Sequence, residues 1–282
     1  MPNAALSWQQ AAVVTAVLAV LSAALYAART RRWRTVALLA REAAIVAGLY
    51  SLWQLAGSVA VVGTDGAFAR ARWIERTERA LHLPPEAAVQ HVVTASPVVA
   101  QAANVYYATM HFTAVFVLLL WLFFRHRDRY RPVRRVLALT TFLCLLIQML
   151  PVAPPRLLPG FTDTAREYGQ SVYALGFGAD QLSAMPSVHV AWAALVAWAV
   201  WPIGHGPGRW LGPVHFVLTV IVVVATANHF WTDGVVAVAV LAVAFAVERG
   251  GEAAALRLRA VRRRVPVADR ELSSVANGGI LR

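Results

Sequence analysis

The chain has 282 residues, of which 59% are hydrophobic and 14% are charged, and its formal net charge at pH 7 is +12. So high an apolar fraction is typical of a protein that crosses a membrane several times. The single cysteine, Cys144, excludes a disulfide or a thiolate metal cluster within one chain.

Seven apolar stretches are long enough to cross a bilayer core of about 30 Å, which needs about 20 residues of helix. In chain order they lie near residues 10–28, 43–63, 106–124, 134–152, 187–203, 210–228 and 232–248. The first follows an uncharged leader and precedes "RTRRWR", the reverse of the secretory order, which predicts an uncleaved anchor. We therefore expect an anchor and basic loop over residues 1–42, a membrane domain over 43–248 and a basic, disordered tail over 249–282.

The arginines predict the orientation of the chain. Seven spans make successive loops alternate between the two sides of the membrane, and twenty of the 26 basic residues, all of them arginine, fall on one side. That side, with the C-terminal tail, should face the cytoplasm, and we expect a multi-pass protein of the plasma membrane. Basic loops beside a bilayer also account for the net charge, so we expect no nucleic-acid partner.

Three polar segments fall together on the opposite, extracytoplasmic side. They are "PVAPPRLLPGF" at 151–161, "MPSVH" at 185–189 and "ANHFWTD" at 227–233. Ionisable groups at membrane depth are costly and tend to face a bundle interior or a wet cavity. The convergence of these segments predicts a functional site.

His229 and Asp233 are four residues apart in the last of these segments. If the segment is helical, the two side chains share a face and the carboxylate accepts from one imidazole N–H. The other ring nitrogen then has a free lone pair, as nucleophilic attack on phosphorus requires. The alternative is a helix-end hydrogen bond with a structural role alone.

Ser187 and His189 follow Pro186, which suits the first turn of a helix. They would lie at the positive end of the helix dipole, where free amides favour an anion. His189 could there protonate a leaving oxygen and later remove a proton from an acceptor. The alternative is a capping serine beside an interfacial histidine.

Arg156 follows a cluster of prolines that stops the fourth span and holds the arginine near the interface. Its guanidinium fork suits phosphate oxygens. The alternative is an ordinary arginine whose head group snorkels to the membrane surface.

The segments "PPRL", "MPSVH" and "NHFWTD", in this order and spacing, resemble the type 2 phosphatidic acid phosphatase superfamily. The closer resemblance is to its aureobasidin-resistance, or inositol phosphorylceramide synthase-like, branch. The segments "NVYYATMHF" at 104–112 and "RYRPVRR" also resemble bacterial members of that branch. The resemblance covers roughly residues 43–248. It implies an all-α polytopic membrane protein with a six-helix catalytic core, to which this chain adds one N-terminal transmembrane helix.

The resemblance also implies a mechanism in which histidine forms and breaks a phosphohistidine without a metal or other cofactor. Carried over, His229 is the nucleophile, Asp233 its orienting partner and His189 the general acid and base. Ser187 and Arg156 become phosphate ligands.

Departures from the phosphatase branch bear on the substrate. That branch has a lysine and an arginine where this chain has Met149 and Val223, and a proline and a glycine where it has Leu157 and Val188. Two fixed cations are therefore absent. A phosphomonoester carries a charge of about −1.5 to −2 near neutral pH, whereas a diester carries about one negative charge, so the chain favours a diester donor.

We therefore expect an inositolphosphotransferase-like enzyme whose partners are membrane lipids, a lipid phosphate donor and a hydroxyl or water acceptor. Arg166, or an arginine between residues 70 and 79, could restore the missing charge. The alternative reaction is hydrolysis of phosphatidic acid or polyprenyl phosphate. Oligomeric state is left open by the sequence.

Two further alternatives belong to other classes. His189, His229 and Asp233 could form a two-histidine, one-carboxylate metal triad, although a fixed cation such as Arg156 is unfavourable beside a dication. The second alternative is a non-catalytic lipid-phosphate binding or transport protein, which would bind its ligand tightly without turnover.

Two other regions have a predicted place near the site. Asn104, Tyr107 and His111 share one face of the third span, where they could line the pocket or simply pack. Residues 68–92 carry too many charges to cross the membrane and predict an amphipathic segment on the outer surface, over the site.

Overall fold

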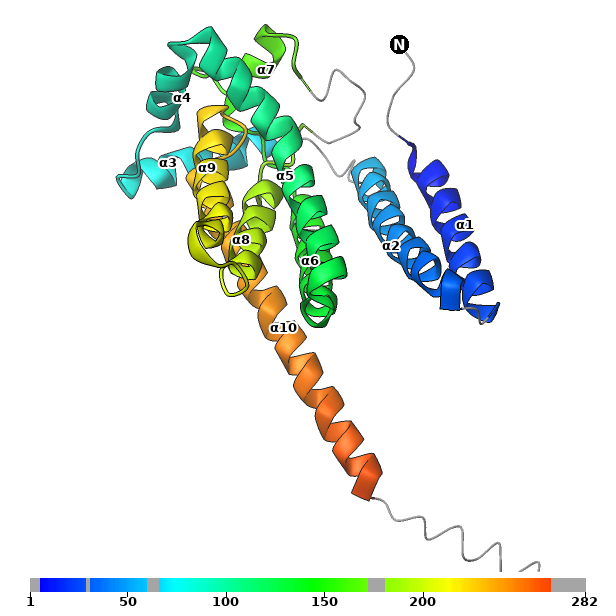
Figure 1. Ribbon diagram of the computed structural model, residues 1–282. Coiled ribbons are helices and arrows are strands. Elements are labelled where there is room, and N and C mark those ends of the chain that lie inside the picture. Colours follow the sequence, from blue (N-terminus) through cyan, green and yellow to red (C-terminus); the bar gives the residue numbers. More distant parts are fainter. Residues whose placement is uncertain (1–5, 29–30, 60–65, 172–180, 265–282) are drawn as a thin grey trace, which may run out of the picture.

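A computed structural model describes residues 6–28, 31–59, 66–171 and 181–264. Across these residues the fold is all-α, with one isolated parallel bridge between Val152 and Ser183 (Figure 1). The α-helices are α1 (Trp8–Ala27), α2 (Arg31–Val59), α3 (Ala67–Ala80), α4 (Glu86–Thr94), α5 (Pro97–Arg125), α6 (Arg127–Gln148), α7 (Thr164–Glu167), α8 (Val188–Val200), α9 (Leu211–Ala225) and α10 (Trp231–Arg264). Short 3-10 turns, η1 (Pro155–Leu157) and η2 (Gly206–Trp210), precede α7 and α9.

Five helices among the described residues have the length and apolar composition of membrane spans: α1, α2, α5, the η2–α9 segment and α10. This confirms an all-α, multi-pass membrane protein. The second span lies earlier than predicted, because its apolar window is Arg32–Leu52 and not residues 43–63. Arginine is a good helix former, so the basic loop expected at 29–42 continues directly into the helix.

The fourth and fifth predicted spans differ from the others. α6 lacks a window apolar enough to count as a span, because its first turns contain five arginines and Pro132. α8 is apolar apart from His189 but has only 13 residues. Both pack inside the bundle, so neighbouring helices rather than lipid cover much of their surface.

The predicted disordered tail is wrong for residues 249–264, where α10 continues as helix to Arg264. This stretch is rich in Ala, Leu, Arg and Glu, which are strong helix formers, and only Gly250 and Gly251 oppose it. The rest of the tail, residues 265–282, lies outside the described residues.

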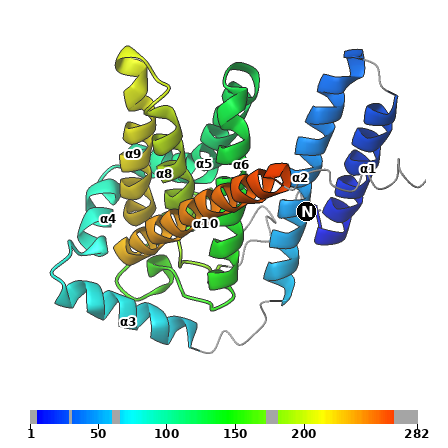
Figure 2. The same cartoon turned by 90° about the horizontal axis from the view of Figure 1, so that it is seen from below.

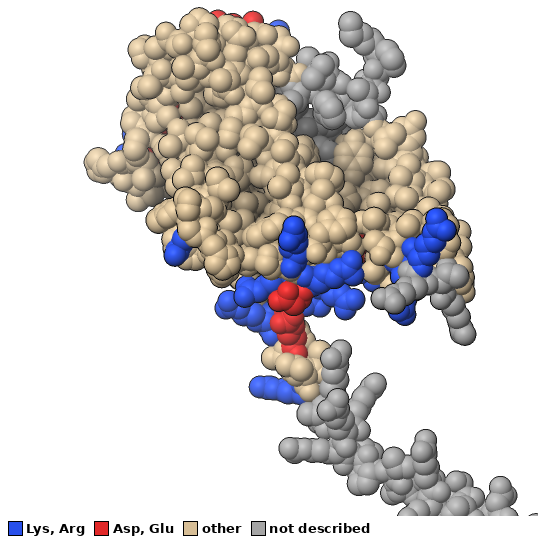
Figure 3. Space-filling model, in the orientation of Figure 1, with Lys and Arg blue, Asp and Glu red and all other residues tan. Residues whose placement is uncertain are grey.

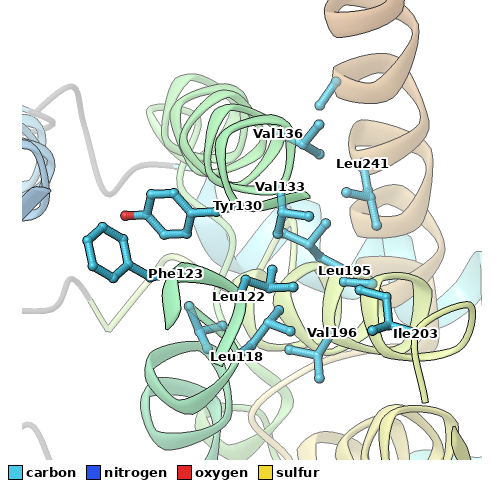
Figure 4. Packing of buried hydrophobic residues seen from close by; sticks show 13 residues of the cluster. Leu118, Leu122, Phe123, Tyr130, Val133, Val136, Leu195, Val196, Ile203 and Leu241 are labelled. Carbon is cyan, nitrogen blue, oxygen red and sulfur yellow. The ribbon is translucent and has the colours of Figure 1, made fainter. Parts of the chain in front are cut away.

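The core of the bundle is built from α5, α6, α8 and α10 (Figure 4). Leu118 and Leu122 from α5, Val133 and Val136 from α6 and Leu195 from α8 are almost fully buried. Leu241 of α10 packs against the same cluster. This interdigitation fixes the positions of the helices whose ends carry the polar segments.

The α1–α2 hairpin lies beside the bundle and touches it along α6 (Figure 2). The contact is polar at its centre: Tyr130 donates to Glu42 over 2.8 Å, and Arg134 forms an ion pair with the same carboxylate. Figure 3 shows basic side chains along the lower edge of this face, where α10 leaves the bundle. Arg135 pairs with Glu248 and Glu252 of α10.

Residues 68–92 form the helices α3 and α4 and the turn between them. α3 is amphipathic, and it turns Ala67, Ala71, Ile74 and Glu78 toward the protein. The three apolar residues pack against the segments at Val152–Ala153 and against Phe230. The predicted amphipathic segment is therefore confirmed, and it lies against two of the three polar motif segments.

Candidate active site

Backbone hydrogen bonds hold the first two motif segments together. Val152 N–H donates to Leu182 O over 2.6 Å, and Ala184 N–H donates to Val152 O over 3.1 Å. The prolines around residues 151–155 cannot continue α6, so the chain leaves the helix extended and able to pair in this way. The PPRL turn is thereby fixed beside the start of α8.

A turn at the end of α9 brings in the third segment. Ala227 N–H donates to Val224 O and Asn228 N–H donates to Val223 O, the hydrogen-bond pattern of a Schellman motif. Ala227 has φ 51°, which costs an alanine about 1–2 kcal/mol relative to a right-handed conformation. Its carbonyl accepts from Arg156 N–H over 2.8 Å, so this strained turn connects the arginine to the histidine segment.

His229 is buried just before α10, with 4% of its surface exposed. Its Nδ1 lies 2.7 Å from the carbonyl oxygen of Ala184 and 3.3 Å from Asp233 Oδ2. Asp233 Oδ2 also accepts from the backbone N–H of Phe230. Asp233 thus holds the first turn of α10 and the imidazole at once.

The contact with Ala184 determines which ring nitrogen carries the proton in the neutral imidazole. A carbonyl oxygen can only accept a hydrogen bond, so Nδ1 must be the donor. The lone pair is then on Nε2, which is buried and has no hydrogen-bond partner among the described residues. The structure therefore presents His229 in the tautomer that a nucleophilic imidazole needs.

Ser187 is the N-cap of α8, as the structural alternative predicted: its Oγ accepts from Val190 N–H. The hydroxyl keeps its own hydrogen as a donor, so capping does not prevent a contact with a phosphate oxygen. Its backbone N–H donates to Asp233 O, which ties the start of α8 to α10.

His189 faces His229 across the site, with ring centroids 5.7 Å apart. At this separation one phosphoryl group can contact both rings. Tyr107 stacks on His189 at 4.3 Å, and His111 approaches the same ring at 4.0 Å. Two of the three residues predicted on the face of the third span are thus in the site.

Asn104 and Arg166 lie elsewhere. The Asn104 amide donates to Gln170 Oε1 and accepts from Thr164 Oγ1, so it fastens the segment around α7 to α5. Arg166 is an exposed residue of α7. The first is a structural hydrogen-bonding residue, and the second is not part of the histidine cluster.

Arg156 is buried, and its guanidinium is held by groups that sequence reasoning did not single out. Nε donates to Asn228 Oδ1 over 2.9 Å, and Nη1 lies 3.7 Å from Asp163 Oδ2. The Asn228 amide group in turn donates to Thr226 Oγ1. Asn228 immediately precedes His229, and that adjacency was the available signal for it.

The metal alternative has little support from the geometry. Within the described ranges, no group of three or more His, Cys, Asp or Glu side chains is arranged to hold a metal ion. Asp233 Oδ2 lies against His229 Nδ1, the ring nitrogen that carries the proton, so this carboxylate does not share a side with the Nε2 lone pair that a metal would need.

A family model of the PAP2 superfamily, the type 2 phosphatidic acid phosphatases, matches residues 72–247. The chain belongs to the PAP2 superfamily. The match contains all three motif segments and begins after the α1–α2 hairpin. No curated protein and no solved structure matches the chain.

PAP2 members are phosphatases or phosphotransferases that act on lipid phosphates, and the protein is an enzyme of this general class. The match confirms the superfamily predicted from the motifs. It does not separate the inositol phosphorylceramide synthase-like branch from the others.

We expect Asn228→Ala to lower kcat by about 10- to 100-fold, because a hydrogen bond to a charged group contributes about 1.5–3 kcal/mol. The side chain orients Arg156, so KM for the lipid should change by a smaller factor. Steady-state kinetics in detergent would measure both constants. Asn104→Ala removes another buried asparagine and is the control, and an equal loss of kcat in that variant would contradict the assignment.

Proposed function

We propose that this PAP2 enzyme transfers a phosphorylated head group between membrane lipids through a phosphohistidine on His229, in the manner of an inositolphosphotransferase. The observation that carries the proposal is the hydrogen bond from His229 Nδ1 to the carbonyl of Ala184. It leaves the Nε2 lone pair facing a site that also contains His189 and Arg156.

In the first step, His229 Nε2 attacks the phosphorus of the donor lipid, and the bond from phosphorus to the lipid oxygen breaks. His189, in its protonated form, gives its proton to that oxygen, so a neutral lipid alcohol leaves. The positive charge that develops on the His229 ring is stabilised by Asp233, which lies against Nδ1.

In the second step, His189 removes a proton from the acceptor hydroxyl, whose oxygen attacks the phosphorus. The bond between phosphorus and Nε2 breaks, and His229 returns to its starting state. Arg156, Ser187 and the amides at the start of α8 would stabilise the phosphate oxygens in both steps. Water as acceptor makes the reaction hydrolysis, and a lipid hydroxyl makes it head-group transfer.

Charge in the site supports a diester donor. Val223, at the position of an arginine in the phosphatase branch, is buried in the apolar core. Arg70 donates to Pro151 O, and Arg72, Arg76 and Arg79 are exposed, which supports a site without the missing cation. Arg156 is a buried cation that Asn228 ties to the segment that carries His229.

Asp163 lowers the positive charge of this site further, because its carboxylate lies 3.7 Å from Arg156 Nη1. A dianionic phosphomonoester bound at Arg156 would be repelled by this carboxylate more strongly than a diester with one negative charge. Asp163 thus supports selection of a diester.

The test is to incubate the purified protein in detergent with phosphatidylinositol, phosphatidic acid or a polyprenyl phosphate, with a chelator present, and to identify products by mass spectrometry. We expect release of diacylglycerol and transfer of inositol phosphate to outpace release of inorganic phosphate. Faster turnover of the phosphomonoesters would overturn the proposal in favour of a phosphatase.

Asp163→Asn should raise the rate on phosphatidic acid relative to phosphatidylinositol by roughly 3- to 10-fold, as relief of about 1 kcal/mol of screened repulsion predicts. Competing turnover of the two lipids would measure the ratio. Glu167→Gln removes an exposed carboxylate from the same short helix and is the control. An unchanged ratio in Asp163→Asn would contradict the role of Asp163.

The proposal includes the orientation of the protein. The site lies at the end of the bundle that carries α3, α4 and α7, whereas α2 begins, α5 ends and α6 begins at the other end (Figure 1). The latter segments contain most of the arginines between the spans. We therefore propose a plasma-membrane protein whose active site is extracytoplasmic, whose C-terminus is cytoplasmic and whose partners are lipids.

A further inference from the structure

Two buried carboxyl groups outside the site meet at the start of α10. Glu78 comes from α3 and Glu86 from α4, and 2% and 5% of their surfaces are exposed. Glu78 Oε1 accepts from the Thr232 N–H, and Pro84 O, two residues before Glu86, accepts from Trp231 Nε1, so both glutamates lie at the first turn of α10. Burial of two carboxylates side by side is very unfavourable unless a proton neutralises one of them.

The unsatisfied atoms point to that shared proton. Glu78 Oε2 and Glu86 Oε1 are both buried, and neither receives a hydrogen bond in the part of the chain that the structure describes. A proton on one carboxyl group supplies the donor that the pair lacks. Burial, and then the hydrogen bond with Glu78, raises the pKa of Glu86 to about 8.

The pair is attached to the helix that carries the nucleophile. Glu78 Oε1 accepts from the backbone N–H of Thr232 over 2.6 Å and also from its hydroxyl. The turn between α3 and α4 adds a contact, because Trp231 Nε1 donates to Pro84 O. Glu78 of α3 therefore caps the Thr232 amide in the first turn of α10, while Asp233 of α10 itself accepts from the Phe230 amide.

Thr232 directly precedes Asp233, which holds His229 Nδ1 and the Phe230 amide. Displacement of Glu78 would therefore shift Asp233, the residue that holds the His229 imidazole. The charged groups that face the pair are Asp233, with which Glu78 interacts electrostatically, and His229 beyond it. On α3, Glu75 and Arg79 pair with each other at the surface.

We propose that Glu78 and Glu86 form a proton-sharing carboxyl pair that positions the start of α10, and with it Asp233 and His229, for phosphoryl transfer. Both are positioning residues, since neither touches the reacting atoms. The kinetic part of this inference rests on the proposed function, whereas the shared proton can be tested by stability alone.

The stability test uses the pH dependence of unfolding. The pKa of Glu86 is about 4.5 in an unfolded chain and about 8 in the folded protein, so between these values only the folded state keeps the proton. The contribution of Glu86 to stability is thus complete below about pH 4.5 and is lost as the pH rises to about 8. Glu86→Gln removes this pH-dependent contribution to stability.

We expect the melting temperature of wild type in detergent to fall between pH 5 and pH 8 relative to that of Glu86→Gln, whose amide keeps a donor at every pH. Glu75→Gln removes a half-buried carboxylate of α3 that pairs with Arg79 and not with Glu86, and it should follow wild type. Parallel pH curves for wild type and Glu86→Gln would overturn the shared proton whether or not any substrate is turned over.

The kinetic test uses Glu78→Gln with phosphatidylinositol. We expect kcat to fall at least tenfold while KM changes less than threefold, and Glu75→Gln to keep the wild-type kcat. At pH 6, kcat of Glu86→Gln should fall less than threefold, because the glutamine amide imitates the protonated acid. A kcat for Glu78→Gln equal to that of Glu75→Gln would overturn the positioning role.

These outcomes separate the inference from the proposed function. If wild type turns over none of the lipids, the proposed function fails, and the melting curves still decide the proton sharing. If Glu78→Gln does not fold, the comparison of Glu86→Gln with wild type still decides it.

Discussion

Replacement of His229 by glutamine should abolish turnover, with a loss of roughly 10⁴-fold or more, which is the scale seen when the nucleophile of a covalent mechanism is removed. Glutamine keeps a donor for the Ala184 carbonyl but has no lone pair on nitrogen that can attack phosphorus. Single-turnover kinetics with radiolabelled donor would show whether label becomes attached to the protein.

His111→Gln is the matched control, because His111 also touches His189 but has no contact with Asp233 among the interactions described above. We expect it to retain an acid-labile phosphoenzyme. Persistence of labelled phosphoenzyme in His229→Gln, or its absence from wild type during turnover, would show that His229 is not the nucleophile.

Replacement of Arg156 by lysine should give the second largest loss, about 10²- to 10³-fold in kcat, although the positive charge is kept. Loss of one preoriented donor to a developing oxyanion has this magnitude in other enzymes. A lysine cannot donate to Asn228 Oδ1 and also present a planar fork to a phosphate. The measurement is kcat and KM with phosphatidylinositol.

The control for this variant is Arg166→Lys, since Arg166 lies in the next segment and is exposed. It should stay within about threefold of wild type, as surface substitutions usually do. If kcat fell as much in Arg166→Lys as in Arg156→Lys, the phosphate would have to contact α7, and the assignment of Arg156 as its ligand would be contradicted.

The reacting residues could be predicted from the sequence because their positions follow local rules. His229 and Asp233 are four residues apart, although His229 lies just before α10 and not within it, and Pro186 and Ser187 mark a helix start. The expected pairing of His229 with Asp233 is present at 3.3 Å, and Ser187 is the N-cap. Local spacing was sufficient for both.

The groups that support these residues could not be predicted in the same way. The Ala184 carbonyl is a backbone atom, 45 residues from His229, and no side-chain pattern marks it. Asp163 contacts Arg156 because the loop between them folds back on itself. Such contacts depend on tertiary packing, which periodicity does not encode.

Glu78 is an intermediate case. It continues the spacing of Ala67, Ala71 and Ile74 on the buried face of α3, so the sequence placed a carboxylate on an apolar helix face. A charge in that position needs a partner, and the pattern alone could have marked it as unusual. Its partners Glu86 and Thr232 lie on other helices and became visible only in the fold.

The helix boundaries were wrong where composition changes within one helix. The predictions for α2 and for residues 249–264 treated arginine as a sign of a loop or tail. Arginine favours helix and extends its head group into water, so a helix can continue past the membrane surface.

The α1–α2 hairpin is packed chiefly on itself, and its described links to the remaining helices centre on Glu42 and α6. The first two spans can therefore complete their insertion during synthesis, before α5 has left the ribosome, because the hairpin needs no later segment to bury its own interface. The PAP2 core then assembles beside a finished hairpin. Loss of the Glu42 contacts would let the hairpin drift laterally in the bilayer while leaving the chemistry of the core untouched.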